Sequence, residues 1–251
     1  MAGHSHWARI KRAKAVTDAR RGRAWSKLSR AIIVAARAGG GDIDANLTLR
    51  YAVDAAKAAN MPKDTIERAI KKGSGDLDGV NYEELTYEGY GPGGAAILIS
   101  ALTDNRNRTA PEIKKIFERR GGNLGASNSV AWMFNRRGVI TIPASATDEE
   151  SITHIALEAG GDDIRHDGDA FVLECDAAAF STVRKAVEDA GLTPESAEIS
   201  MIPANTVTVS GEDAEKLMKL IDDLEEHDDV QNVYGAYEIP EAELDRLAGG
   251  A

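Results

Sequence analysis

Apolar residues recur at helical spacing through the first part of the chain. Positions three or four residues apart predict a helix over residues 17–38, which three consecutive glycines then end. A second helix is expected after Asp44 or Asn46, and a third begins near Pro62. We therefore expect a small bundle of three helices over residues 1–75.

The pattern changes beyond residue 80 to short apolar runs that alternate with helical segments. YEGYGPGG is typical of a tight hairpin turn, and it is followed by an apolar strand at 96–102, a helix at 108–120 and a strand at SVAWMF. Residues 137–203 then give strand, helix, two strands, helix and strand. This βαββαβ order is that of the ferredoxin-like fold.

The segments on either side of this unit form a second module. TVTVS, a helix over 212–226 and the strand VQNVYGAYEI complete the elements found before residue 137. The predicted fold class is α+β, with an N-terminal three-helix domain followed by two ferredoxin-like α/β modules, the last inserted into the middle one. The expected domains are 1–75, 80–136 plus 204–240, and 137–203.

Composition indicates a globular protein without a membrane segment. The chain has 251 residues, 43% of them hydrophobic, and its single cysteine, Cys175, excludes an intramolecular disulfide. No apolar stretch approaches the roughly 18 residues of a membrane helix, so we expect a soluble, cytoplasmic protein. An Arg-rich start is also typical of a mitochondrial presequence, but Asp18, Trp7 and Trp25 favour a folded unit.

Charge is strongly segregated along the chain. Residues 1–37 contain ten Lys or Arg and one acid, Asp18, although the whole protein has a formal net charge of -11. Residues 144–251 contain 27 Asp or Glu and six Lys or Arg. Because charges are screened beyond about 8 Å, the acidic half does not cancel the field of the basic end. A dense basic segment predicts binding to nucleic-acid phosphates, whereas the alternative is a solvated helix face.

The basic arm and the first helix are the main candidate surface. The residues expected to contact phosphates are Lys11, Arg12, Lys14, Arg20, Arg21, Arg23, Lys27 and Arg30. Trp7 either stacks on a base or packs the arm against the bundle. Lys71 and Lys72 either extend this surface or complement the dipole of the third helix.

The segment DNRNRT, residues 104–109, lies where a strand gives way to a helix. Arg106 and Arg108 could converge there on one phosphate, together with free backbone N–H groups. The alternative is a turn capped by Asp104 or Asn107, with the arginines paired to nearby acids. YEGYGPGG is not a phosphate-binding loop, since it lacks both GxxxxGK[ST] and a GxGxxG before a helix.

Five motifs carry a family resemblance. They are AGHSHWARIKRAKAVTDARRGR, AANMPKDTIERAIKKG, YEGYGPGG, LTDNRNRT and GGNLGASNSVAWMF. In this order they resemble the YebC/PmpR family of probable transcriptional regulators. The resemblance implies cytoplasmic proteins of three domains with DNA-binding regulatory roles, in some members work at the ribosome, and mitochondrial relatives that activate translation. His6 and the stretch 126–128 depart from the usual pattern.

Nothing in the sequence assembles a catalytic or metal site. The histidines are scattered, and Cys175 has no histidine nearby in sequence, so we expect no enzyme, no metal and no cofactor. The acidic run 222–229 lacks the alternating oxygen ligands of a calcium loop and is interpreted as a solvated helix end.

We therefore expect a DNA-binding transcriptional regulator that contacts the phosphate backbone. No helix has a recognition-helix pattern, so reading of base edges is not indicated. The alternative is a ribosome-associated translation factor or translational activator that binds ribosomal RNA with the same surface. A third class is an adaptor whose acidic modules bind basic proteins, including those of the ribosome; otherwise the acidic modules face away from nucleic acid and limit non-specific binding.

Overall fold

The computed structural model describes residues 18–75, 77 and 81–249. The chain divides into two compact units. The first unit runs to Ala131 and resumes over Ser210–Gly235, and the second is made of Trp132–Val209 and the chain from Ala236. None of the helices in the described ranges is both long and apolar enough to cross a membrane.

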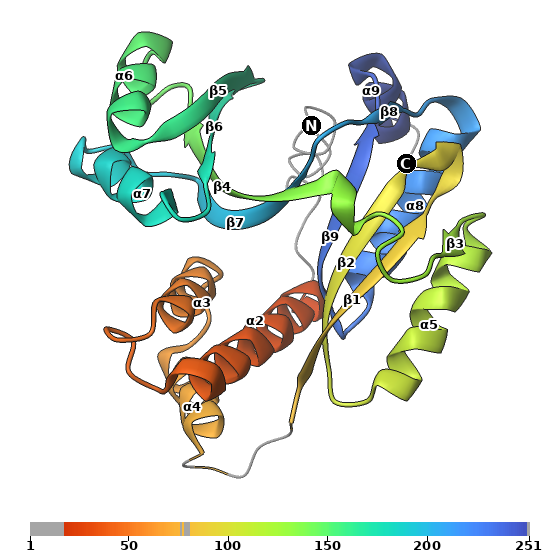
Figure 1. The fold of residues 1–251 in the computed structure, drawn as a ribbon, viewed down its shortest axis with the longest axis horizontal. Helices are drawn as coiled ribbons and strands as arrows, with labels where there is room; N and C mark the ends of the chain where they lie inside the picture. Colours follow the sequence, from red (N-terminus) through yellow and green to blue (C-terminus); the bar gives the residue numbers. More distant parts are fainter. Residues whose placement is uncertain (1–17, 76, 78–80, 250–251) are drawn as a thin grey trace. The chain divides into compact units, whose positions relative to one another are not determined.

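Three helices form the first part of the first unit, as the apolar spacing predicts. They are α2 (Asp18–Gly39), α3 (Leu47–Ala58) and α4 (Lys63–Ser74). Both α3 and α4 pack on α2 (Figure 1). The core between the helices contains Ile32, Leu49 and Ala56, all fully buried. Burying these side chains holds short helices together that would be marginal alone.

Asn46 joins the end of α2 to the start of α3. Its side-chain oxygen accepts a hydrogen bond from the Leu49 backbone N–H at 3.1 Å, as an N-cap does. Its side-chain nitrogen donates to the carbonyls of Ala35 at 2.8 Å and Gly40 at 2.9 Å. Gly40 has a positive φ of 87°, which ends α2 in the left-handed conformation.

A five-stranded sheet follows, with strands in the order β3-β1-β2-β9-β8. Its elements are β1 (Glu83–Tyr90), β2 (Ala96–Thr103), α5 (Arg106–Arg119), β3 (Asn123–Leu124), β8 (Val207–Thr208), α8 (Gly211–Glu226) and β9 (Val230–Glu238). The antiparallel pair β1–β2 is closed by a tight turn over Pro92–Gly94, so the expected hairpin is confirmed. Helices α5 and α8 contact each other (Figure 1). Arg119 and Arg120 both donate to Asp223 of α8, at 2.7 and 2.6 Å.

The second unit contains a four-stranded antiparallel sheet, ordered β5-β6-β4-β7. Its elements are β4 (Phe134–Pro143), α6 (Glu149–Ala159), β5 (Gly161–Asp167), β6 (Ala170–Asp176), α7 (Phe180–Asp189) and β7 (Ser196–Pro203), with α9 (Glu241–Gly249) near the end of the chain. Figure 1 shows α6 and α7 beside this sheet. The order is that of a ferredoxin-like βαββαβ unit.

The expected α+β class is confirmed, but the strand predicted at SVAWMF is wrong. Ala131–Met133 form a 3-10 turn, and Phe134 begins β4 of the second sheet. The backbone turns here because the N–H groups of Val130 and Ala131 donate to the buried carboxylate of Glu88 instead of a strand partner. β3 takes the edge position of the first sheet. The expected domain bounds stay predictions.

Close packing of α4 on α2 predicts opposite effects for two glycine substitutions. In Gly73→Ala the new Cβ would lie 2.5 Å from the Ile33 carbonyl oxygen and 2.6 Å from the Ala36 Cβ. Such overlap costs about 1–3 kcal/mol and outweighs the roughly 1 kcal/mol gain in helix propensity, so urea unfolding should show net destabilisation. Gly22→Ala, with nothing within 4 Å, should instead stabilise the protein. Equal effects would contradict the close approach.

Candidate nucleic-acid interface

The structure describes only part of the predicted basic surface. Lys11, Arg12 and Lys14 lie outside the described residues, as does Trp7. Arg20 and Arg21 belong to α2, but their side chains are not described. The remaining predicted cations have described positions: Arg23, Lys27, Arg30, Lys71, Lys72, Arg106 and Arg108.

Three of these cations, on α2, contact the acidic run 222–229, which we call the acidic corner. Lys27 Nζ donates to the Glu225 carbonyl at 2.5 Å, and an Arg23 guanidinium nitrogen lies 3.8 Å from Glu226 Oε1. Arg30 donates to the carbonyl of Asp228 and to the carboxylate of Asp229, the latter at 3.0 Å. These three described cations of α2 are thus paired within the chain.

Asp229 is the most heavily bonded carboxylate of this region. Its side chain is 3% exposed, and besides Arg30 it accepts from Arg108 at 2.7 Å, Thr109 at 2.7 Å and Thr103 at 3.1 Å. Burial by itself would raise the pKa of Asp229, but the hydrogen bonds from Arg108, Thr109 and Thr103 outweigh it and lower the pKa. The interpretation of 222–229 as a solvated helix end is therefore wrong for Asp229, because it lies under α5 and not in water.

Arg106 and Arg108 have different surroundings in the DNRNRT segment. Arg108 bonds Asp229 and also Asp104, at 3.1 Å. Arg106 is exposed and has no ion pair among the described residues. The N-cap of α5 is Asn105, which accepts from the Arg108 N–H at 3.2 Å, and not Asp104 or Asn107 as predicted. The capped-turn alternative thus describes Arg108, and anion binding by Arg106 stays a prediction.

Helix α4 presents the clearest group of unpaired cations. Lys71 and Lys72 are exposed, and so is Arg68, which the sequence reasoning missed. The three lie at i, i+3 and i+4, on the face away from the buried Ile66 and Ala69. Within the described part of the chain, none of the three side chains has a hydrogen bond or an ion pair. The signal for Arg68 was available, because its spacing from Lys71 and Lys72 places it on the same face.

Glu88 organises the loop that leads from β3 to β4. This buried carboxylate accepts from the backbone N–H groups of Asn128 at 2.6 Å, Val130 at 2.7 Å and Ala131 at 2.7 Å. Burial would raise the pKa of Glu88, but these backbone hydrogen bonds outweigh it and lower the pKa. Because these hydrogen bonds are all within the chain, we assign Glu88 the structural role of holding this loop in place.

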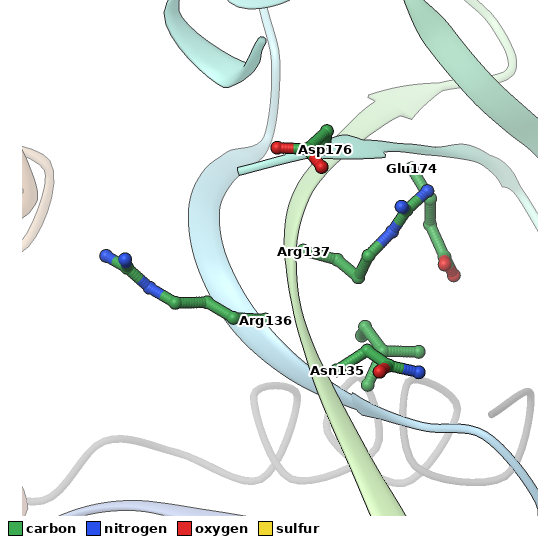
Figure 2. A pocket seen from close by; sticks show the side chains of 6 residues that line it. Asn135, Arg136, Arg137, Glu174 and Asp176 are labelled. Carbon is green, nitrogen blue, oxygen red and sulfur yellow. The ribbon is translucent and has the colours of Figure 1, made fainter. Parts of the chain in front are cut away.

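A cavity of about 400 Å³ in the second unit has mixed charge (Figure 2). Its lining consists of Asn135, Arg136, Arg137, Glu174, Asp176 and Ile202. Arg137 pairs with Asp162 at 2.5 Å and Glu174 pairs with Arg165, whereas Figure 2 shows Arg136 directed away from the other labelled side chains. The charges of Arg137 and Glu174 are thus paired within the second unit.

Two observations on the described residues bear on metal and thiol chemistry. No group of three His, Cys, Asp or Glu side chains there is placed to hold a metal ion. Cys175 is buried, and burial raises the pKa of its thiol, which disfavours the reactive thiolate.

Comparison with known proteins identifies close relatives. The family model described as the TACO1/YebC protein N-terminal domain matches residues 5–76, and that of the TACO1/YebC second and third domain matches residues 82–237. A probable transcriptional regulatory protein of Acidithiobacillus ferrooxidans is 55% identical, covering 98% of both chains. One of Syntrophotalea carbinolica is 53% identical, covering 99% of this chain and 100% of that one. The crystal structure of a conserved hypothetical protein from Aquifex aeolicus matches with a TM-score of 0.82 and 45% identity, covering 89% of this chain and 93% of that one.

The Asp229 contacts predict a specific loss of stability. Asp229→Asn removes the charge that Arg30 and Arg108 share, and we expect urea unfolding at pH 7 to show a loss of about 2–3 kcal/mol. Because the folded pKa of Asp229 lies below its unfolded value, the wild-type stabilisation is present above the unfolded pKa and is lost as pH falls through the folded pKa. The variant should therefore lose less stability than wild type between pH 7 and pH 3. Parallel pH curves for the two proteins would contradict this role.

Proposed function

Since this chain belongs to the TACO1/YebC family, we propose that it is a DNA-binding transcriptional regulator that contacts the phosphate backbone through its helical N-terminal domain. The family expected from the five motifs is confirmed by these matches. Relatives that are at least half identical over nearly the whole chain are named probable transcriptional regulatory proteins, which supports the regulatory part of the proposal. The DNA contacts rest on the chain's own charges.

The observation that carries the proposal is the group of exposed cations on α4. Arg68, Lys71 and Lys72 lie on one helix face and have no carboxylate partner among the described residues. Cations on neighbouring turns of a helix suit a row of phosphates, and they release condensed counterions when they bind it. No internal acid has to be displaced from these three side chains first.

The other predicted cations divide into two groups. We assign Arg106, Arg23 and Lys27 to the phosphate-binding surface, together with the basic residues at 11, 12, 14, 20 and 21 that the sequence places beside them. Arg30 and Arg108 are assigned to the scaffold, because the buried carboxylate of Asp229 holds both of them. A group held in this way exchanges its partner only at a high cost in free energy.

This surface suits recognition of backbone shape and not of base edges. The α4 cations are two lysines and one arginine, and no Asn or Gln, the residues that pair with adenine edges, lies on the same face. Ribosomal RNA offers the same phosphates, so a translation factor is the competing outcome. In either case we propose a non-enzymatic cytoplasmic protein whose work is binding.

A salt titration tests the proposal directly. We expect the protein to bind a 30-base-pair duplex with log affinity falling linearly against log salt, and the triple variant Arg68→Ala, Lys71→Ala, Lys72→Ala to bind more weakly. Each lost phosphate contact flattens the slope by about 0.9, so the triple variant should have a slope flatter by about 2.7. Fluorescence anisotropy between 50 and 200 mM salt measures both quantities.

The matched control removes three lysines that have partners within their own helices. Lys185, Lys216 and Lys219 each pair with an acid four residues away, and their joint change to Ala alters net charge by the same amount. The control should keep a slope near that of wild type. Equal loss in both triple variants would mean that only net charge matters and would remove the case for α4.

A further inference from the structure

The contact between α2 and the acidic corner has a buried part and an exposed part. In the buried part, the Arg30 side chain is 19% exposed and Asp229 is 3% exposed. In the exposed part, Arg23 is 39% and Glu226 50% exposed, and Lys27 donates to the backbone carbonyl of Glu225. The two parts therefore differ in how easily solvent or another anion replaces them.

The exposed part is easily exchanged. An ion pair 3.8 Å long between half-exposed side chains contributes little to stability and weakens further with salt. The buried pair behaves differently, because Asp229 also bonds Arg108 and Thr109 and would leave several groups unsatisfied if it moved. Arg30 thus anchors the contact while Arg23 and Lys27 can change partners.

The acidic corner offers α2 what a phosphate backbone offers. It combines carboxylates at 225, 226 and 228 with the backbone carbonyls of the last turn of α8, and a helix C-terminus carries partial negative charge. The last turn of α8 has no basic residue of its own to balance this charge. The cations of α2 supply that balance, so they are engaged in the absence of nucleic acid.

We propose that the acidic corner is an intramolecular competitor of nucleic acid, which occupies Arg23 and Lys27 until phosphates displace it while the Arg30–Asp229 pair stays closed. The inference rests on the proposed function, because it requires that α2 binds phosphates. Binding then begins on the unpaired cations of α4 and extends to α2 as the competitor leaves. Because a polyanion must displace the acidic corner from Arg23 and Lys27, weak and non-specific polyanions bind less tightly.

Removing one carboxylate from the corner should strengthen binding. Glu226→Gln releases Arg23 without touching the buried pair, and we expect duplex DNA to bind about two- to fivefold more tightly than to wild type. The matched control is Glu212→Gln at the other end of the same helix. Glu212 is 88% exposed and pairs with Lys216, so its change removes the same charge away from α2.

The test compares wild type, Glu226→Gln and Glu212→Gln by anisotropy on one 30-base-pair duplex at fixed salt. Tighter binding by Glu226→Gln than by Glu212→Gln supports the competitor. Equal affinities for the two variants overturn it and leave the proposed function standing, provided that wild type binds with the expected salt slope. Failure of all three proteins to bind would overturn both proposals.

Amide hydrogen exchange is a second measurement, and a general effect of net charge on DNA affinity would not change it. Adding the duplex should speed amide exchange in residues 222–228, because the exposed part of the contact opens, while exchange in β2 stays unchanged. Slower or unchanged exchange in 222–228 on saturation with duplex would show that the corner is not displaced and would overturn the inference.

Discussion

One carboxylate, that of Asp229, joins the parts of the first unit on which the proposed surface depends. It bonds Arg30 of α2, Arg108 and Thr109 of α5, and Thr103 at the end of β2. A charge buried this deeply is stable only when it is paired and fully hydrogen-bonded. These partners therefore fix the position of α2 against the first sheet, and they pair Arg30 and Arg108 within the chain.

The same contact decides which cations face solvent. With Arg23, Lys27 and Arg30 of α2 against the acidic corner, a group of three exposed cations without an ion pair among the described residues remains on α4, at 68, 71 and 72. The net charge of -11 does not reveal this arrangement. Some of the basic residues of α2 form ion pairs with acidic residues near the end of the chain, as Arg23 does with Glu226 and Arg30 with Asp229. The basic N-terminal segment and the acidic residues 222–229 therefore interact directly in the fold.

Local signals in the sequence predicted local structure well. Asn46, Pro62 and the glycines after α2 are residue types that favour helix ends, so the three-helix bundle could be predicted from the sequence. The positions of Lys71 and Lys72 in the last turn of α4 could be predicted in the same way. The role of Asp229 could not be derived, because its partners lie 121 and 199 residues away and an acid within an acidic run is indistinguishable from a solvated one. The turn at Ala131 was missed for the same reason, since Glu88 lies 43 residues earlier.

Nucleic acid is proposed to bind this protein on its helical N-terminal domain. Ultraviolet crosslinking in growing cells, with mass spectrometry of the attached peptides and sequencing of the attached nucleic acid, tests it most directly. We expect crosslinked peptides from the helical domain, including α4, attached to discrete promoter DNA. The same peptides attached to ribosomal RNA would keep the surface and make the protein a translation factor. Crosslinks confined to residues 134–203, or none at all, would contradict the account.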